Sequence, residues 1–143
     1  MIKLKHILTE AMGDCYQAAG RLIMDHMSKG KLVHGMVNGQ GSLDGIRFGH
    51  AWVEVGSKVL DHSNGKKKSI SKKLYYAMGK INPSQCKYYK YKDAAKFMVD
   101  KGHWGPWEMS GGVVMAEEIP DAKGEIGKKN QRISNDILDK LND

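Results

Sequence analysis

The chain has 143 residues, of which 41% are hydrophobic, so it fits one globular domain over residues 1–143 and leaves no room for a second catalytic domain. No apolar run approaches the ~20 residues of a membrane-spanning helix, and the start MIKLKHILTEAMGD lacks the apolar core and cleavage site of a signal peptide, so we expect a cytoplasmic protein without a membrane partner. The two cysteines have no CxxC or metal-ligand spacing, which argues against a fold held together by disulfides. The formal net charge of +7 would attract phosphates, acidic polymers or anionic surfaces.

The first well-defined element is a helix, which follows residues 2–11, a segment that fits either a short helix or a strand. In DCYQAAGRLIMDHMSKG, residues 14–30, apolar side chains from Cys15 to Met27 recur at helical spacing. Asp14 is predicted as the N-cap and Gly30 as a left-handed C-terminal cap. Cys15 is therefore expected in the first turn of a helix whose apolar face is buried.

Strands are expected after this helix. The sequence predicts a strand in KLVHGMV, a glycine-rich loop in NGQGSLDGI, and a strand-turn-strand hairpin in GHAWVEVGSKVLDHS, residues 49–63. The rest predicts a helix over 69–80, a strand over 86–92, a helix over 92–102, an irregular loop over 103–112, and a last helix near 125–141 that is polar enough to fray. This order of elements is typical of an α+β domain.

The position of Cys15 has chemical consequences. A thiol in the first helical turn lies near unsatisfied backbone N–H groups and the positive end of the helix dipole, and both favour the nucleophilic thiolate. The same N–H groups can hold the negative oxygen that forms when an amide or ester carbonyl is attacked. Taken alone, however, a single cysteine is more often a small buried hydrophobic side chain, so Cys15 by itself does not indicate catalysis.

The hairpin supplies two possible partners for Cys15. If Gly56 and Ser57 form a two-residue loop, Asp61 and His50 lie on one face of the hairpin as diagonal neighbours. A carboxylate and an imidazole can bridge that separation of about 7 to 8 Å with a hydrogen bond, whereas a loop of odd length would put Asp61 on the opposite face. The three residues then predict a catalytic triad in which Cys15 is the nucleophile, His50 the general base and acid, and Asp61 its orienting partner.

Four segments in this order, GDCYQAAGRLI, LVHGMVNG, GHAWVEV and VLDHS, resemble the core of the transglutaminase-like branch of the papain-fold cysteine hydrolases and acyltransferases. In that family a cysteine opens the central helix, a histidine starts an H-A-W-V-E-V-like strand, and an aspartate lies on the next strand. The resemblance covers residues 12–64 and implies a nucleophile helix packed on an antiparallel sheet. It gives Cys15, His50 and Asp61 the roles assigned above, leaves Trp52 as a packing residue, and implies no cofactor and no metal.

The resemblance implies hydrolysis of an amide-type bond, or another acyl transfer, through a thioacyl-enzyme intermediate on a peptide, protein or cell-wall peptide. The sequence has no acidic calcium loop, so calcium-regulated protein cross-linking is a poorer match. The sequence does not decide whether water or an amine accepts the acyl group. It also leaves the oligomeric state open. Some relatives complete the site for the negative oxygen with a polar side chain that precedes the cysteine. Thr9 and Glu10 precede Cys15 but are poor candidates for this role, and Gln17 follows Cys15. The substrate-binding walls are expected from residues 38–45 and from the region after residue 64.

A second interpretation uses the basic segments GKKKSISKK, residues 65–73, and KYYKYK, residues 87–92. Lysines with interleaved tyrosines could bind nucleic acid or another polyanion without any catalysis. No recognisable nucleic-acid motif accompanies the charge, so a solvated loop followed by a half-buried strand is the preferred interpretation.

Several other residues have simpler structural interpretations. His34 is expected to be a hydrogen-bonded core histidine rather than a partner of the site, and His62 is expected to point away from His50. Trp104 and Trp107 are expected to anchor their loop rather than to form the rim of a groove. Cys86 is expected to be an inert thiol in a strand.

Overall fold

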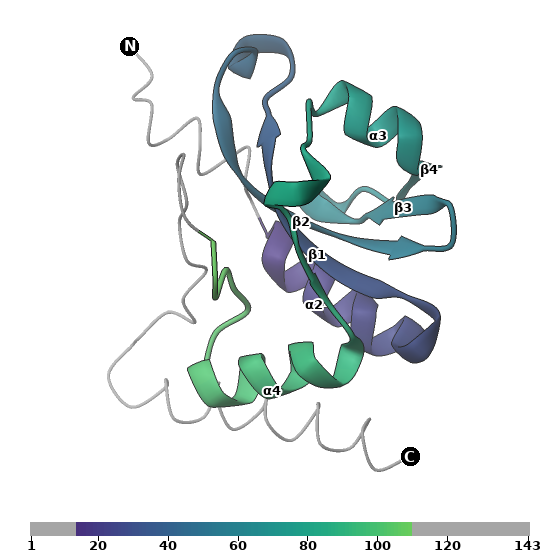
Figure 1. Ribbon diagram of the computed structural model, residues 1–143, viewed down its shortest axis with the longest axis vertical. Coiled ribbons are helices and arrows are strands. Elements are labelled where there is room, and N and C mark those ends of the chain that lie inside the picture. Colours follow the sequence, from purple (N-terminus) through teal and green to yellow (C-terminus); the bar gives the residue numbers. More distant parts are fainter. Residues whose placement is uncertain (1–13, 110–143) are drawn as a thin grey trace.

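The structure is a computed structural model that describes residues 14–109 (Figure 1). The elements expected over residues 2–11 and near 125–141 lie outside the described residues. The helices are α2 (Cys15–His26), α3 (Lys72–Met78) and α4 (Tyr91–Lys101), and the strands are β1 (Lys31–Asn38), β2 (Arg47–Val55), β3 (Lys58–Asp61), β4 (Lys68–Ser71) and β5 (Lys87–Tyr89). None of the helices in this range has the length and apolar character needed to cross a membrane.

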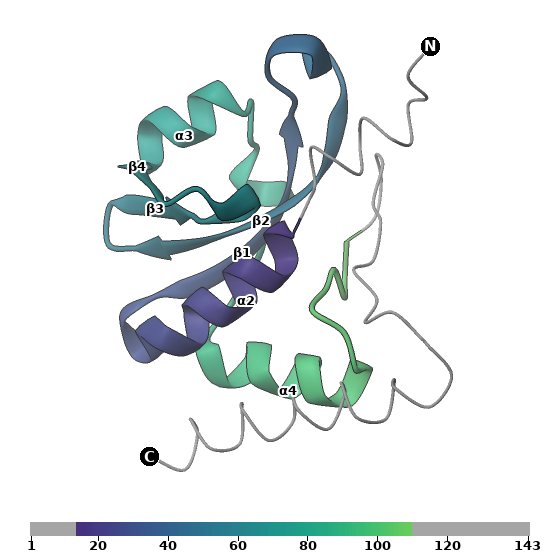
Figure 2. The same ribbon diagram turned by 180° about the vertical axis from the view of Figure 1, so that it is seen from behind.

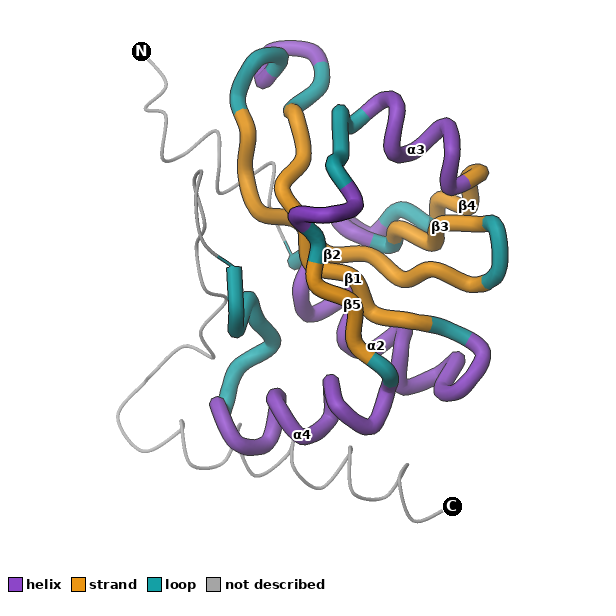
Figure 3. The backbone as a smooth tube through the Cα atoms, viewed as in Figure 1, coloured by secondary structure: helices purple, strands orange, loops and turns teal. Residues whose placement is uncertain are grey.

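The strands form one antiparallel sheet in the order β4-β3-β2-β1-β5 (Figure 3). β1 and β2 form the longest ladder, from Lys31 opposite Glu54 to Asn38 opposite Arg47. β5 follows α3 in the chain and returns to the other side of β1, where Leu32 lies opposite Tyr89. The predicted α+β class and antiparallel sheet are confirmed.

Helices cover both faces of the sheet. Trp52 and Val53 are neighbours in β2 and therefore point to opposite faces. The ring of Trp52 contacts Tyr75 of α3, with centroids 5.3 Å apart, whereas a methyl group of Val53 lies against Gly30, next to Ile23 of α2. Figure 2 shows α2 against the strands from the side opposite to the view of Figure 1. The core consequently has two layers, one on each side of β2.

The loop after α4 packs onto α2 at a glycine. Met98 of α4 is fully buried, and a Cβ atom on Gly20 would lie 3.1 Å from Met98 Cε and 2.7 Å from Trp104 Cε3. The missing side chain at Gly20 therefore lets α4 and its following loop approach α2 closely.

The end of α2 differs from the prediction. The helix ends at His26, and Met27, with a positive φ of 51°, is the first residue of a short 3-10 turn, η1 (Met27–Lys29). Gly30 has an extended backbone with φ −133°, so its assignment as a left-handed cap is wrong. Close packing accounts for this glycine instead, because a Cβ atom there would lie 3.1 Å from Val53 Cγ1 and 3.3 Å from Ile23 Cδ1.

Two predicted boundaries are also wrong. Residues 69–71 were expected in a helix but belong to β4, because this segment pairs with β3 from Lys58 opposite Ser71 to Asp61 opposite Lys68. The Ser71 side chain then accepts a hydrogen bond of 3.2 Å from the Leu74 N–H and starts α3. The predicted strand 86–92 is shorter, since its last residues 91–92 begin α4 and Cys86 precedes β5.

Candidate active site

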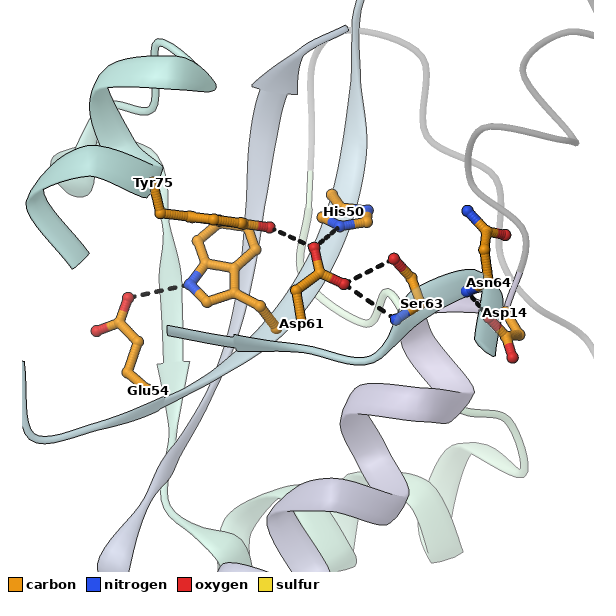
Figure 4. Close-up of polar contacts among 8 residues, drawn as sticks. Asp14, His50, Glu54, Asp61, Ser63, Asn64 and Tyr75 are labelled. Atoms are coloured by element: carbon orange, nitrogen blue, oxygen red, sulfur yellow. Dashed lines mark hydrogen bonds and ion pairs between the residues drawn. The ribbon is translucent and has the colours of Figure 1, made fainter. Parts of the chain in front are cut away.

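The two hairpin residues meet in the predicted register. Glu54 pairs with Val59 across a two-residue turn in which Gly56 has φ 60°. Nε2 of His50 lies 2.9 Å from Oδ2 of Asp61 (Figure 4). Both residues are only 7% exposed, so the imidazole and the carboxylate are paired away from bulk solvent.

Hydrogen bonds reach both oxygens of Asp61. Oδ2 accepts from the Tyr75 hydroxyl at 2.8 Å as well as from His50, while Oδ1 accepts from the Ser63 backbone N–H at 3.0 Å and from Ser63 Oγ at 2.6 Å (Figure 4). Burial alone would raise the pKa of Asp61, but the bonds from His50 and Ser63 hold it well below its usual range. Asp61 is therefore an ionised acceptor, and Nε2 of His50 carries the hydrogen between them.

Cys15 is the first residue of α2 and is 1% exposed. Asp14 occupies the predicted N-cap position, but its side chain makes no cap hydrogen bond to the helix. Its Oδ1 instead accepts a hydrogen bond of 2.8 Å from the backbone N–H of Asn64 in the turn η3 (Ser63–Gly65). Since η3 follows Asp61 closely in the chain, this bond connects the start of α2 to the end of the hairpin that carries Asp61.

Cys15 and His50 interact directly. Burial alone would lower the pKa of His50, but the negative charge of Cys15, hydrogen bonds with Asp61 and Cys15, and the charge of Asp61 raise it to about 10. Asp61 occupies Nε2, and Nδ1 is buried without a nitrogen or oxygen partner in the described part of the chain. Nδ1 is therefore the nitrogen available to the thiol. This arrangement favours a Cys15 thiolate beside a His50 imidazolium.

The first turn of α2 is the place where the sequence predicts that a negative oxygen would be held. The hydrogen bond from Ala18 N to Asp14 O, 2.8 Å long, closes the first turn. Backbone N–H groups before such a bond point out of the helix end, and the N–H of Cys15 is one of them. A carbonyl oxygen placed there would gain negative charge as the sulfur attacks, and the N–H groups would stabilise it. Thr9 and Glu10 lie outside the described residues.

A groove with a volume of about 300 Å³ runs along one side of α2. The α2 side of the groove is a stripe of residues spaced by three and four positions, and one residue after β3 completes it: Asp14, Gln17, Ala18, Arg21, Leu22, Asp25 and His62. The groove includes Asp14, the residue before Cys15, but residues 38–45, predicted as a wall of the substrate site, do not line it. His62 belongs to this groove and does not join the His50–Asp61 pair.

His34 is buried but is not the hydrogen-bonded core histidine that was expected. The rings of Tyr16, Tyr89 and Trp107 surround it at centroid distances of 5.0, 5.1 and 4.9 Å. Within residues 14–109 neither ring nitrogen has a hydrogen-bond partner. Burial, with a smaller contribution from His103, lowers the pKa of His34 to about 3. His34 is therefore a neutral core residue and not a fourth member of the site.

The two loop tryptophans anchor their segment, as expected. Trp104 is buried, with the guanidinium of Arg21 5.2 Å from its ring centroid, and Trp107 stacks on Phe97 at 5.1 Å. Trp52 is likewise fully buried, and its Nε1 donates a 3.0 Å hydrogen bond to Glu54, which supports its assignment as a packing residue.

Two residues that contact Asp61 were missed in the sequence. Ser63 lies two positions after Asp61, and this spacing is a known signal for a side chain that bonds the backbone and hydroxyl of its own turn. Tyr75 comes from α3 and gives no such local signal, because only the packing of α3 against the sheet brings its hydroxyl to Asp61.

Within residues 14–109, no group of three or more histidine, cysteine, aspartate or glutamate side chains could hold a metal ion. In comparisons with known proteins, the chain matches no protein-family model, no curated protein and no solved structure.

Proposed function

We propose that the protein is a cysteine hydrolase or acyltransferase that acts on an amide-type bond through Cys15, His50 and Asp61. The observation that carries this proposal is the buried 2.9 Å hydrogen bond between His50 and Asp61, which leaves the second imidazole nitrogen for a cysteine at the start of a helix. The charge interaction and hydrogen bond between Cys15 and His50 support it as well. Together these features can activate a thiol as a nucleophile.

In the first half of the reaction, the Cys15 thiolate attacks the carbonyl carbon and forms the C–S bond. Negative charge moves to the carbonyl oxygen, which the N–H groups at the start of α2 stabilise. The C–N bond then breaks, and Nδ1 of His50 gives its proton to the departing amine. The products of this half are a free amine and a thioester on Cys15, with His50 neutral and Asp61 still ionised.

In the second half, the neutral Nδ1 of His50 takes a proton from water or from an acceptor amine as that molecule attacks the thioester. The C–S bond breaks, the acyl group leaves as an acid or a new amide, and Cys15 returns as a thiolate beside the imidazolium. Throughout both halves, Asp61 keeps the Nε2–H bond and so prevents the ring from turning.

The transglutaminase-like, papain-type fold is part of the same proposal. It is supported by the order of Cys15 on a helix, His50 on β2 and Asp61 on β3, and by the packing of that helix on an antiparallel sheet. The proposed substrates are peptides, proteins or cell-wall peptides, since these offer the amide bonds that this chemistry cleaves.

The basic binding function has weaker support. Of the tyrosines in residues 87–92, Tyr89 is buried in the core and only Tyr88, at 40% exposure, presents much of its ring to solvent. A stacking platform for successive bases needs several exposed rings, so these tyrosines do not form one.

The proposal is tested by the pH dependence of Cys15 alkylation with iodoacetamide. The wild-type site and a His50→Ala variant are compared, both with Cys86→Ser so that a single thiol is followed. With His50 present, Cys15 should react at neutral pH, whereas in the variant the reaction should need a pH near the ordinary thiol value of about 8.5.

The second thiol of the chain provides the control. Cys86 is also buried, and its burial raises the pKa of its thiol, so a Cys15→Ser variant should react slowly at neutral pH. If Cys15 reacts no faster than Cys86, and loses nothing in the His50→Ala variant, the catalytic proposal is wrong.

A further inference from the structure

One oxygen of Asp61 has two donors, and the second donor has no place in the proposed triad. Oδ2 accepts from His50 Nε2 at 2.9 Å and from the Tyr75 hydroxyl at 2.8 Å (Figure 4). Both bonds are short, and Asp61 is buried, so neither donor competes with bulk water for this oxygen.

The hydroxyl of Tyr75 is held in place and can only donate in this bond. Its ring lies against Trp52, with centroids 5.3 Å apart, and α3 is fastened at its start by the bond from Lys72 N to Ser57 O, 2.8 Å long. Burial, with added contributions from the charge of Asp61 and the bond to it, raises the pKa of Tyr75 far above its usual range. The phenol consequently keeps its proton, and Asp61, which is ionised, can only accept.

Two donors on one carboxylate oxygen weaken each other, because each draws negative charge away from the other's hydrogen bond. The bond from Tyr75 therefore limits how strongly Asp61 holds the hydrogen on His50 Nε2. A histidine that must release a proton from Nδ1 to a leaving group works best when its imidazolium form is stabilised only moderately.

We propose that Tyr75 is a positioning residue of the candidate active site, whose hydroxyl fixes Oδ2 of Asp61 and moderates the hold of this carboxylate on His50. This inference rests on the proposed function for its catalytic meaning, but the contact itself does not depend on Cys15.

The chain offers a closely matched control in the next residue. Tyr76 also lies on α3, also packs against Trp52, with ring centroids 5.9 Å apart, and also donates its hydroxyl to a buried carboxylate. That carboxylate is Glu54, which is not hydrogen-bonded to His50. Tyr75→Phe and Tyr76→Phe thus remove the same atom from the same helix, at different carboxylates.

The test follows the titration of the His50 imidazole by NMR in three full-length proteins, all with Cys15→Ser: the parent, the Tyr75→Phe variant and the Tyr76→Phe variant. Because the Cys15 thiol is absent from all three proteins, the result does not depend on whether Cys15 is a nucleophile. Tyr75→Phe should raise the pKa of His50 by about half a unit, since Asp61 then serves one donor fewer at Oδ2. Tyr76→Phe should leave it unchanged.

A pKa of His50 that stays the same or falls in the Tyr75→Phe variant overturns the proposal. If that variant does not fold, as judged by circular dichroism, Ser63→Ala in the same background gives the test instead. Ser63→Ala removes the 2.6 Å bond to Oδ1 but keeps the backbone N–H bond, so it should also raise the pKa of His50. An unchanged value in Ser63→Ala would overturn the same idea of shared charge on Asp61.

The failure of this inference can be told apart from the failure of the proposed function. With Cys15 restored, Tyr75→Phe should move the pH profile of Cys15 alkylation to lower pH, because a more strongly stabilised imidazolium favours the thiolate, while Tyr76→Phe should leave the profile unchanged. If Cys15 is unreactive in the protein with wild-type Tyr75, the catalytic proposal is wrong, but the effect of Tyr75 on the pKa of His50 can still be correct.

Discussion

The carboxylate of Asp14 accepts a hydrogen bond of 2.8 Å from the backbone N–H of Asn64, fifty residues further along the chain. This bond joins the residue before Cys15 to the turn that follows the Asp61 strand. It therefore sets the distance between the two parts of the candidate triad that come from different elements, α2 and the β2–β3 hairpin.

Replacing Asp14 with alanine should loosen this connection. We expect Asp14→Ala to slow alkylation of Cys15 severalfold and to lower the free energy of unfolding by at most about 1 kcal/mol, because the bond is solvent-exposed. Asp14→Asn removes the charge but keeps the hydrogen bond, since its amide oxygen can still accept from the Asn64 N–H. Equal losses in the two variants would show that the charge of Asp14, and not its hydrogen bond, matters.

Asp61→Asn should damage both the fold and the site. An amide offers one accepting oxygen and one donating NH₂ group, so it must face two of the present donors with the wrong group. We expect a loss of about 2 to 4 kcal/mol in the free energy of unfolding and at least about a tenfold slower alkylation of Cys15 at neutral pH.

Glu54→Gln is the matched control for Asp61→Asn. Glu54 is the other buried carboxylate near Trp52, and it accepts from Trp52 Nε1 and pairs with Lys72 at 3.1 Å. Its replacement should cost stability, measured by urea unfolding, but should leave the alkylation rate of Cys15 unchanged. A similar drop in that rate would mean that the Asp61 effect reflects general loosening of the sheet.

The pairing of His50 with Asp61 could be predicted because side chains alternate strictly along strands. Once Gly56 and Ser57 were placed in a two-residue turn, the face of each residue in the hairpin was determined. Cys15 at the start of α2 was likewise predictable, since the apolar spacing that defines the helix begins there.

The remaining features depend on contacts that are distant in sequence. Residues 69–71 have no strong strand signal, and only pairing with β3 makes them a strand. Gly30 has the residue type of a helix cap, but its close approach to Val53 decides its conformation. Tyr75 reaches Asp61 only because α3 packs over Trp52. Local patterns carry no information on any of these tertiary contacts.

Cys15→Ser should lower the pKa of His50 from about 10, because burial favours the neutral ring and the charge of Cys15 is the largest effect that opposes burial. The folded pKa of His50 lies above its unfolded value of 6.5, so its protonated form contributes stability below pH 6.5 that is lost as the pH rises through about 10. In Cys15→Ser this loss should occur at lower pH. NMR titration of the imidazole measures the change, and identical titrations would contradict a thiolate–imidazolium pair.

The buried His34 should make the protein sensitive to acid. Its pKa is lowered from 6.5 to about 3 by burial and by His103, so the unfolded state binds a proton at pH values where the folded state does not. The free energy of unfolding should therefore be unaffected by His34 above pH 6.5, and fall as the pH drops from 6.5 toward 3, by up to about 1.4 kcal/mol per pH unit.

His34→Leu should remove this part of the acid sensitivity, because leucine cannot take up a proton and suits a site lined by Tyr16, Tyr89 and Trp107. Urea unfolding at pH 7.5 and pH 5 gives the slope for each protein. Leu74→Ala is the control, since Leu74 is exposed on α3 and has no proton to titrate, so it should leave the slope as in wild type. If His34→Leu and wild type lose the same stability between the two pH values, His34 must be able to accept its proton in the folded protein, through a rearrangement that gives its ring nitrogens a partner.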